Sequence, residues 1–280
     1  MVFEPAMAER AARRSGTESE LRRGLIEGEL FVVYQPVVKF PVEGRPDDPV
    51  DRFAGVEALV RWRHPTRGVV SPLEFIGIAE ECGLIGAVGD TVLSSACRDF
   101  VRWQRELGRR SPQRLAVNLS RGQLGQCGFV ASVSHILHRT GMEPHRLQLE
   151  VTESLAAQDE SVQNTLRDLK TLGVTLALDD FGTGYSSLAS LHLLPVDTIK
   201  IDRSFVSEAV TSAHHRVLIE ATVRVAKSLG MDTVAEGIEN QDQAAVVRQL
   251  GCAKGQGYLF GKPMPTGDLI DWLAVGKAGA

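Results

Sequence analysis

Short apolar runs alternate along the chain with longer segments in which apolar residues recur at helical spacing. A nearly continuous apolar run is typical of a strand buried on both faces. Such runs predict strands at Phe31–Val38, Gly55–Trp62, Arg114–Ser120, Arg146–Glu153, Thr175–Phe181, Thr198–Phe205, Asp232–Glu239 and Gly255–Phe260. Helical spacing predicts helices at Thr91–Leu107, Phe129–Thr140, Ser161–Leu172 and Val217–Leu229, each followed directly by a glycine.

The alternation of strands and helices predicts the class of the fold. Eight strand candidates in a chain of 280 residues fit an α/β fold of the (β/α)8 TIM-like barrel type. The alternative is an open doubly wound sheet, which gathers ligands at one switch point and would not draw on nearly every strand.

Two adjacent carboxylates, Asp179 and Asp180, end one of the apolar runs and stand directly before a glycine-rich turn. Neighbouring residues of a strand point to opposite faces, but both side chains can converge where the strand stops. Two carboxylates held close together repel each other unless a cation lies between them. The pattern indicates a divalent metal site, with an acidic cap of the next helix by Asp180 as the alternative.

Other apolar runs carry a single polar residue inside the run or at its end. These residues are Glu57, Asn118, Glu150, Lys200 and Glu236. In a barrel, the carboxyl ends of the strands meet at one face, where catalytic side chains gather. One such residue could be a satisfied core group, but a polar residue in run after run indicates a shared site.

Several short motifs follow one another in a fixed order. They are Tyr34-Gln35-Pro36, Glu57-Ala58-Leu59, Phe75–Glu80, Asn118-Leu119-Ser120, Glu150–Glu153, Leu178–Leu188, Lys200-Ile201-Asp202, Ala235–Glu239 and Gln256-Gly257-Tyr258. From about Glu20 to Trp272 the chain therefore resembles the EAL domain, the cyclic di-GMP phosphodiesterase family named for its Glu-Ala-Leu signature. The resemblance implies an EAL-type barrel with an irregular first strand at 20–280, preceded by a connector or lead-in helix at 1–19.

The resemblance also implies a site for two divalent cations, Mg²⁺ or Mn²⁺. Glu57, Asn118, Glu150 and Asp179 would hold one ion, and Asp179, Asp180 and Glu236 would hold the other. Hard oxygen ligands suit these ions and argue against a zinc thiolate site. A hydroxide that bridges the ions would attack phosphorus in line with the leaving 3′-oxygen and open cyclic di-GMP to linear pGpG.

The remaining roles come from the same resemblance. Lys200 would act with Glu57 and Glu236 in catalysis by orienting the water and offsetting negative charge. The substrate contacts would be Gln35, Leu59, Arg61, Asp202 and Gln256, with the Arg61 fork on a phosphate oxygen. Glu153 and Glu239 would support the site from behind, and a plain structural role is the alternative for both. A buried Lys200–Glu236 pair and a surface salt bridge of Arg61 are further alternatives. Ala253-Lys254-Gly255 departs from the family pattern, which leaves the placement of Gln256 open.

Composition narrows the class of protein. The formal net charge is −4, and no basic patch for polymeric nucleic acid is evident. No apolar stretch is long enough to span a bilayer and no signal peptide precedes the domain, so we expect a cytoplasmic chain. A full-length parent could still carry a membrane anchor. Cys82, Cys97, Cys127 and Cys252 show no CxxC spacing and are expected to be reduced, mostly buried thiols.

Two segments concern partners. The stretch from Phe3 to Leu25 resembles the connector after a GGDEF domain in tandem proteins, so an upstream GGDEF or sensory domain is expected, with an ordinary lead-in helix as the alternative. A homodimer is expected near the loop Phe181–Ser187, with Tyr185, Leu188 and Leu191 in apolar contact, unless these residues only pack against the barrel. Pro41–Phe53 is predicted to be an extended surface loop.

The predicted function is a metal-dependent phosphodiesterase in bacterial second-messenger signalling. The alternative is a catalytically weak receptor for cyclic di-GMP or a protein-interaction module. Such degenerate members usually lose a metal ligand, the lysine or the glycine-rich loop, and none of these is missing here. A barrel metallohydrolase for another phosphodiester is a third reading, against which the Glu57–Arg61 string argues.

Overall fold

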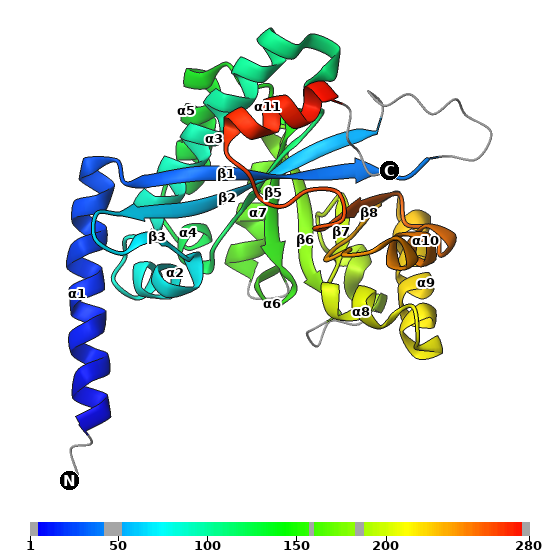
Figure 1. Ribbon diagram of the computed structural model, residues 1–280, viewed down its shortest axis with the longest axis horizontal. Coiled ribbons are helices and arrows are strands. Elements are labelled where there is room, and N and C mark those ends of the chain that lie inside the picture. Colours follow the sequence, from blue (N-terminus) through cyan, green and yellow to red (C-terminus); the bar gives the residue numbers. More distant parts are fainter. Residues whose placement is uncertain (1–4, 42–51, 157–159, 183–187, 276–280) are drawn as a thin grey trace.

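One sheet closes on itself and forms a barrel (Figure 1). The structure is a computed structural model that describes residues 5–41, 52–156, 160–182 and 188–275, without the side chains of 5–15, 189–190 and 275. The barrel strands are β1 (Leu30–Lys39), β2 (Phe53–His64), β4 (Leu115–Asn118), β5 (Leu147–Thr152), β6 (Thr175–Phe181), β7 (Thr198–Ile201), β8 (Asp232–Ala235) and β9 (Lys254–Gln256). The short β3 (Gly68–Val70) pairs with the end of β2 outside the barrel. The predicted TIM-like barrel is confirmed.

The first strand runs against its neighbours. β1 pairs antiparallel with β2 on one side and with β9 on the other, whereas β2 and β4 to β9 pair in parallel. The register of β1 also shifts between Val37 and Val38. The expected irregularity of the first strand is therefore a reversal of its direction.

Helices cover the outside of the barrel (Figure 1). The longer ones are α2 (Pro72–Glu81), α3 (Ile85–Leu107), α5 (Phe129–Thr140), α7 (Glu160–Thr171), α9 (Ala213–Ser228), α10 (Gln241–Gln249) and α11 (Thr266–Val275). Short turns of helix are α4 (Arg121–Leu124), α6 (Glu153–Ala156), α8 (Arg203–Glu208), η1 (Gly108–Arg110), η2 (Pro144–Arg146) and η3 (Leu188–Leu193). No helix in the described ranges is both long enough and apolar enough to cross a bilayer.

Several predicted boundaries were wrong because side chains past the strand ends begin other elements. Glu153 starts α6, and Phe205 lies in α8, which Asp202 caps by accepting a hydrogen bond from the Ser204 amide. Glu239 and Phe260 lie beyond the ends of β8 and β9. Phe53 is a buried residue of β2 and not part of the predicted loop Pro41–Phe53, most of which lies outside the described residues.

A long helix, α1 (Pro5–Glu27), leads into the barrel and extends well away from it (Figure 1). Its last turns pack on the barrel through the fully buried Leu21 and through Gly24, which lies against Trp62. The helix is continuous across the boundary at residue 19, so secondary structure does not mark the predicted division. The division into a connector at 1–19 and a barrel at 20–280 stays a prediction.

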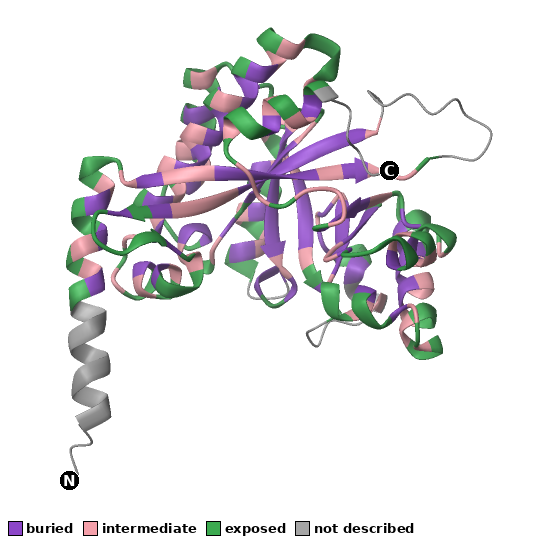
Figure 2. Cartoon of the chain, in the orientation of Figure 1, coloured by how far each residue is buried: buried purple, intermediate pink, exposed green. Residues whose placement is uncertain are grey.

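The barrel interior is built in layers from alternate strands, as in other eight-stranded barrels. The strand registers bring Glu57, Glu150, Lys200 and Gln256 to one level from β2, β5, β7 and β9. Beneath them lies a small, apolar layer of Val37, Ala116, Ala177 and Val234. Gly55, Gln148, Thr198 and Lys254 form the next level down. The strands are buried along most of their length (Figure 2).

Candidate active site and metal centre

Four side chains on one interior level form the floor of the candidate site. Glu57, Glu150, Lys200 and Gln256 are all more than nine-tenths buried. Two carboxylates and an ammonium are costly to bury unless they pair with one another or hold a metal. A branched apolar layer would be the ordinary filling of a barrel, so a charged level at this place makes it the candidate site.

Lys200 stands at the centre of a cage of carboxylates. Its Nζ lies 2.7 Å from Glu150 Oε2, 2.8 Å from Glu236 Oε1, 3.0 Å from Asp179 Oδ1 and 3.7 Å from Glu57 Oε2. The lysine is 3% exposed. The alternative of a buried Lys200–Glu236 pair thus describes only one of four contacts.

The cage shifts the titration of its members in opposite directions. Burial lowers the pKa of Lys200, but the surrounding carboxylates outweigh it and hold that pKa well above its usual value. Burial raises the pKa of Glu57, yet Lys200 and hydrogen bonds from Gln256 and Asn118 leave that pKa lowered. Burial raises the pKa of Glu150, and that of Glu236 to about 8, against the opposing pull of Lys200. Lys200 therefore stays charged, while the carboxylates compete for one cation.

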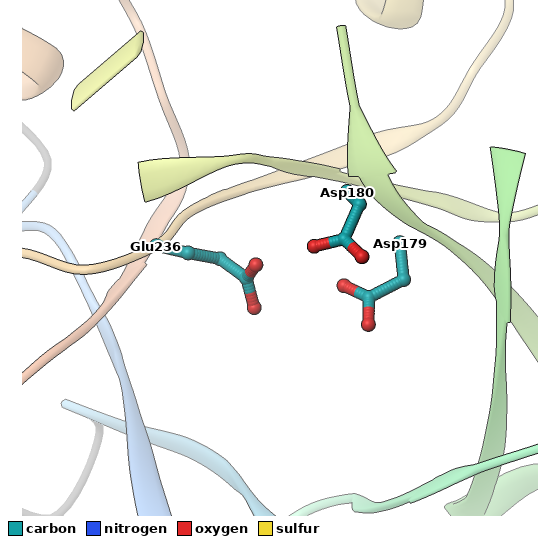
Figure 3. A group of neighbouring side chains, drawn as sticks. All are labelled: Asp179, Asp180 and Glu236. Atoms are coloured by element: carbon teal, nitrogen blue, oxygen red, sulfur yellow. The ribbon is translucent and has the colours of Figure 1, made fainter. Parts of the chain in front are cut away.

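Asp179, Asp180 and Glu236 form an acidic cluster beside this cage (Figure 3). Each offers an oxygen within 4.8 Å of the others, and the three carboxylates point toward one another. Asp180 reaches the cluster because its backbone is left-handed, with φ 54°, an uncommon state outside glycine. Burial, Asp179 and Asp202 raise the pKa of Asp180. The strand end thus turns the second carboxylate to the same side as the first.

The donor set fits a hard divalent cation. Asp179 Oδ1 is buried and has no hydrogen-bond partner, because its contact with Lys200 does not meet hydrogen-bond geometry. A buried carboxylate oxygen that accepts no hydrogen bond, converging with two further carboxylates, suits an oxygen-liganded Mg²⁺ or Mn²⁺. No cysteine or histidine belongs to the cluster, which argues against zinc.

Amide side chains orient Glu57 from both sides. Asn118 Nδ2 donates to Glu57 Oε1 at 2.6 Å, and Gln256 Nε2 donates to Glu57 Oε2 at 2.6 Å. Gln256 Nε2 also donates to Gln35 Oε1 at 3.1 Å. Gln256 therefore contacts Glu57 and Gln35, although the residues before it depart from the family pattern.

A model of the EAL domain family matches residues 18–263. The chain belongs to the EAL domain family. An uncharacterized signaling protein of Caulobacter vibrioides is 42% identical over 99% of the chain and 33% of the relative. The bifunctional diguanylate cyclase/cyclic di-GMP phosphodiesterase MucR of Pseudomonas aeruginosa is 39% identical over 97% of the chain and 38% of the relative. This EAL domain thus spans about a third of the length of these curated relatives.

Solved structures agree with this family. The PaMucR phosphodiesterase in its c-di-GMP complex has a TM-score of 0.81 and 39% identity, over 91% of this chain and 99% of that chain. The EAL enzyme Bd1971 in its cAMP- and cyclic-di-GMP-bound form has a TM-score of 0.85 and 28% identity, over 94% and 70%.

In this EAL domain, Glu153 supports the turn after the acidic pair. Its Oε2 accepts a hydrogen bond from the Gly182 amide at 3.0 Å, and its side chain is buried. Gly182 has φ 103°, and an added Cβ would lie 2.6 Å from the ring of Phe205. The residues after it, 183–187, lie outside the described part of the chain. The expected supporting role of Glu153 is consistent with this contact.

Gly182→Ala should therefore lower activity by about tenfold to a hundredfold, because it displaces the strand end that carries Asp179 and Asp180. Gly230→Ala is the matched control, since Gly230 also has a positive φ but nothing within 4 Å of an added Cβ. Specific activity and melting temperature of both variants would be measured. Equal losses of activity in the two would show that backbone strain alone, and not the site, is responsible.

A groove of about 260 Å³ opens beside the acidic cluster. It is lined by Gln35, Asp202, Glu236, Glu239 and Gln256, together with Arg203 and Tyr258, which sequence reasoning did not assign. Asp202 caps α8 at one wall, and Glu239 lies 3.6 Å from Arg203 at the rim. Glu239 is half exposed, so it contacts the groove and not the interior.

Leu59 lies apart from this groove, in a larger and mostly apolar cavity of about 440 Å³ that Asn118 also lines. Pro72, Ile76 and Glu80 of α2 face it there. Arg61 is half buried, and its Nη1 donates to the Val60 carbonyl at 2.7 Å. In the described part of the chain Arg61 joins no acid in a salt bridge, so that alternative is not supported. Burial lowers the pKa of Arg61, while the nearby Tyr258 and Glu57 act in the opposite direction and raise that pKa.

Two residues expected at a dimer contact lie against the barrel instead. Leu191 is fully buried in the core, and the half-buried Leu188 packs on the same core, while Tyr185 lies outside the described residues. The homodimer stays a prediction.

The cysteines are free, and burial raises the pKa of Cys97 and of Cys252 to about 12, whereas Cys127 is exposed.

Proposed function

We propose that this EAL domain hydrolyses cyclic di-GMP to linear pGpG with the help of two divalent cations. The observation that carries the proposal is the convergence of five carboxylates on Lys200 and on the Asp179–Asp180–Glu236 cluster, with Asn118 hydrogen-bonded to one of them, Glu57. Two relatives, MucR and NbdA, are described as a bifunctional diguanylate cyclase/cyclic di-GMP phosphodiesterase and as a cyclic di-GMP phosphodiesterase. Each is 39% identical to this chain.

Each residue of the centre has a distinct task. Asp179, Asp180 and Glu236 would hold one ion, and Glu57, Asn118, Glu150 and Asp179 the other. Bound Mg²⁺ or Mn²⁺ ions supply Lewis acidity and lower the pKa of water at neutral pH. Asn118 and Gln256 keep Glu57 fixed, so the cage does not have to reorganise during the reaction.

Lys200 contributes positive charge where negative charge develops on the phosphate. Its ammonium is held by several carboxylates at once, which fixes its position without a single dominant partner. Arg61 stands at the edge of the site with a guanidinium suited to phosphate oxygens. The groove beside Tyr258 and the cavity beside Leu59 flank the centre and give room for the two halves of a cyclic dinucleotide.

Incubation of the purified protein with cyclic di-GMP and Mg²⁺ or Mn²⁺ should yield pGpG, and a chelator should stop the reaction. The nucleotides would be separated by liquid chromatography after timed quenching. Omission of both ions from metal-stripped protein is the control. Tight binding of the nucleotide without product under either metal would assign the domain to the receptor class.

The same proposal covers the partners of the domain. α1 would connect to an upstream GGDEF or sensory domain in the parent protein, and the domain would pair as a homodimer in the cytoplasm. The length of the curated relatives, about three times that of this chain, supports the first part. Light scattering over a dilution series would test the second.

A further inference from the structure

A small void lies inside the barrel, beneath the level that carries Glu57, Glu150, Lys200 and Gln256. Its volume is about 20 Å³, and its wall includes Glu150, Lys200, Gln256 and Gln148. A void of this size holds one water molecule, provided that two or more polar groups line it. Glu150, Lys200 and Gln256 supply polar groups above the void, and Gln148 supplies one below it.

The room for the void comes from the sequence. The level directly below the charged one contains Ala116 and Ala177, where barrels ordinarily carry bulky branched residues. Gly55 on the next level down adds further space. Ala116 lines the void together with Val37 and Val234 of the same layer, and the small side chain of Ala116 leaves free space beneath the charged level.

Gln148, which lines the void from below, belongs to a buried polar pair. Gln148 Nε2 donates to Thr198 Oγ1 at 2.9 Å, and both side chains are buried. The pair joins β5 and β7, the same two strands that Glu150 and Lys200 join two levels above at 2.7 Å. A buried amide that could be replaced by an apolar residue needs a reason, because its desolvation is costly.

The amide of Gln256 supplies the second observation. Its Nε2 donates hydrogen bonds to Glu57 and Gln35. These bonds fix the orientation of the amide, so its Oε1 points away from Glu57 and Gln35. This oxygen is buried and has no hydrogen-bond partner. Rotation of the amide would place the oxygen against the Glu57 carboxylate, which electrostatic repulsion forbids. The unpaired acceptor therefore requires a donor beside it.

We propose that the barrel holds an ordered water molecule in this void, and that Gln148 keeps it there as a positioning residue. The water donates to Gln256 Oε1, and Gln256 in turn fixes Glu57 in the orientation that a metal ligand needs. Outer partners of metal ligands commonly change metal affinity by 10–100-fold. The role of Glu57 rests on the proposed function, whereas the water site itself does not.

Two variants test the proposal by different routes. Gln148→Leu removes the residue that holds the water, and Ala116→Val fills the void while it leaves the Gln148–Thr198 hydrogen bond in place. Both should lack electron density in the void that the unchanged protein shows in a high-resolution crystal structure. Both should also bind Mn²⁺ about tenfold more weakly by calorimetry without nucleotide, and lose kcat about tenfold with little change in KM.

Thr222→Val is the control, since Thr222 is also buried and donates to the Leu218 carbonyl, but in α9. It should lower the melting temperature without a change in Mn²⁺ affinity. A void without density, or unchanged Mn²⁺ affinity in Gln148→Leu and Ala116→Val, would overturn the proposal. Absence of cyclic di-GMP hydrolysis by the unchanged protein would instead remove the proposed function, and the density and Mn²⁺ measurements would still decide the water site.

Discussion

Asp179→Ala should lower the hydrolysis of cyclic di-GMP by about 10³-fold or more, the largest loss expected of any single substitution in the chain. Asp179 and Glu236 belong both to the cage around Lys200 and to the cluster with Asp180, but only Asp179 is assigned to both proposed metal positions. Its removal therefore damages both proposed metal positions at once. Because like charges repel in this cluster, the folded protein without added ions should lose little stability.

Product formation under saturating Mn²⁺ and thermal unfolding in a chelator would be measured together. Asp168→Ala is a suitable control, because Asp168 is an exposed carboxylate on α7. The control should keep full activity. Retention of most activity by Asp179→Ala would show that the shared-ligand assignment is wrong.

Lys200→Ala should affect both catalysis and stability. A cation that acts mainly in the transition state lowers kcat when it is removed, here by about 10²–10³-fold, and changes KM much less. In the absence of divalent ions, the variant should also lose about 3 kcal/mol of unfolding free energy, since buried carboxylates remain without their cation. Added Mn²⁺ should restore much of this loss, because the ion replaces the missing positive charge.

Steady-state kinetics and denaturant unfolding with and without Mn²⁺ separate the two effects. Lys227→Ala, an exposed lysine near the end of α9, is the control for loss of a positive charge. A normal kcat with a large KM in Lys200→Ala would make the lysine a substrate anchor and not a catalytic group.

Much of the site follows from the sequence because its residues stand at strand ends. In a parallel barrel the carboxyl ends of all strands meet, so Asp179, Asp180, Glu150, Lys200 and Glu236 can be placed together from the order of the elements alone. The reversal of β1 was expected only as an irregularity. Its direction follows from its long antiparallel pairing with the next strand, β2, whereas its pairing with β9 joins the two ends of the domain and is not encoded by any local pattern.

Other features depend on side-chain contacts across the whole barrel. The hydrogen bond from Gln256 to Glu57 joins residues 199 positions apart, and no spacing rule predicts it. Gln148 and Thr198 read as ordinary strand residues until the register of β5, β6 and β7 is known. α2 was not predicted, and its buried face is small, with Phe75 and Ala79.

The reversed first strand has a consequence for the way the chain enters the domain. Leu30 pairs with Trp62, near the carboxyl end of β2, so β1 begins at the same end of the barrel as the metal ligands. An ordinary barrel would receive its chain at the opposite end. A protein fused ahead of α1 would therefore stand on the side where substrate arrives and product leaves. A bulky reporter attached there should hinder nucleotide exchange far more than the same reporter attached behind α11.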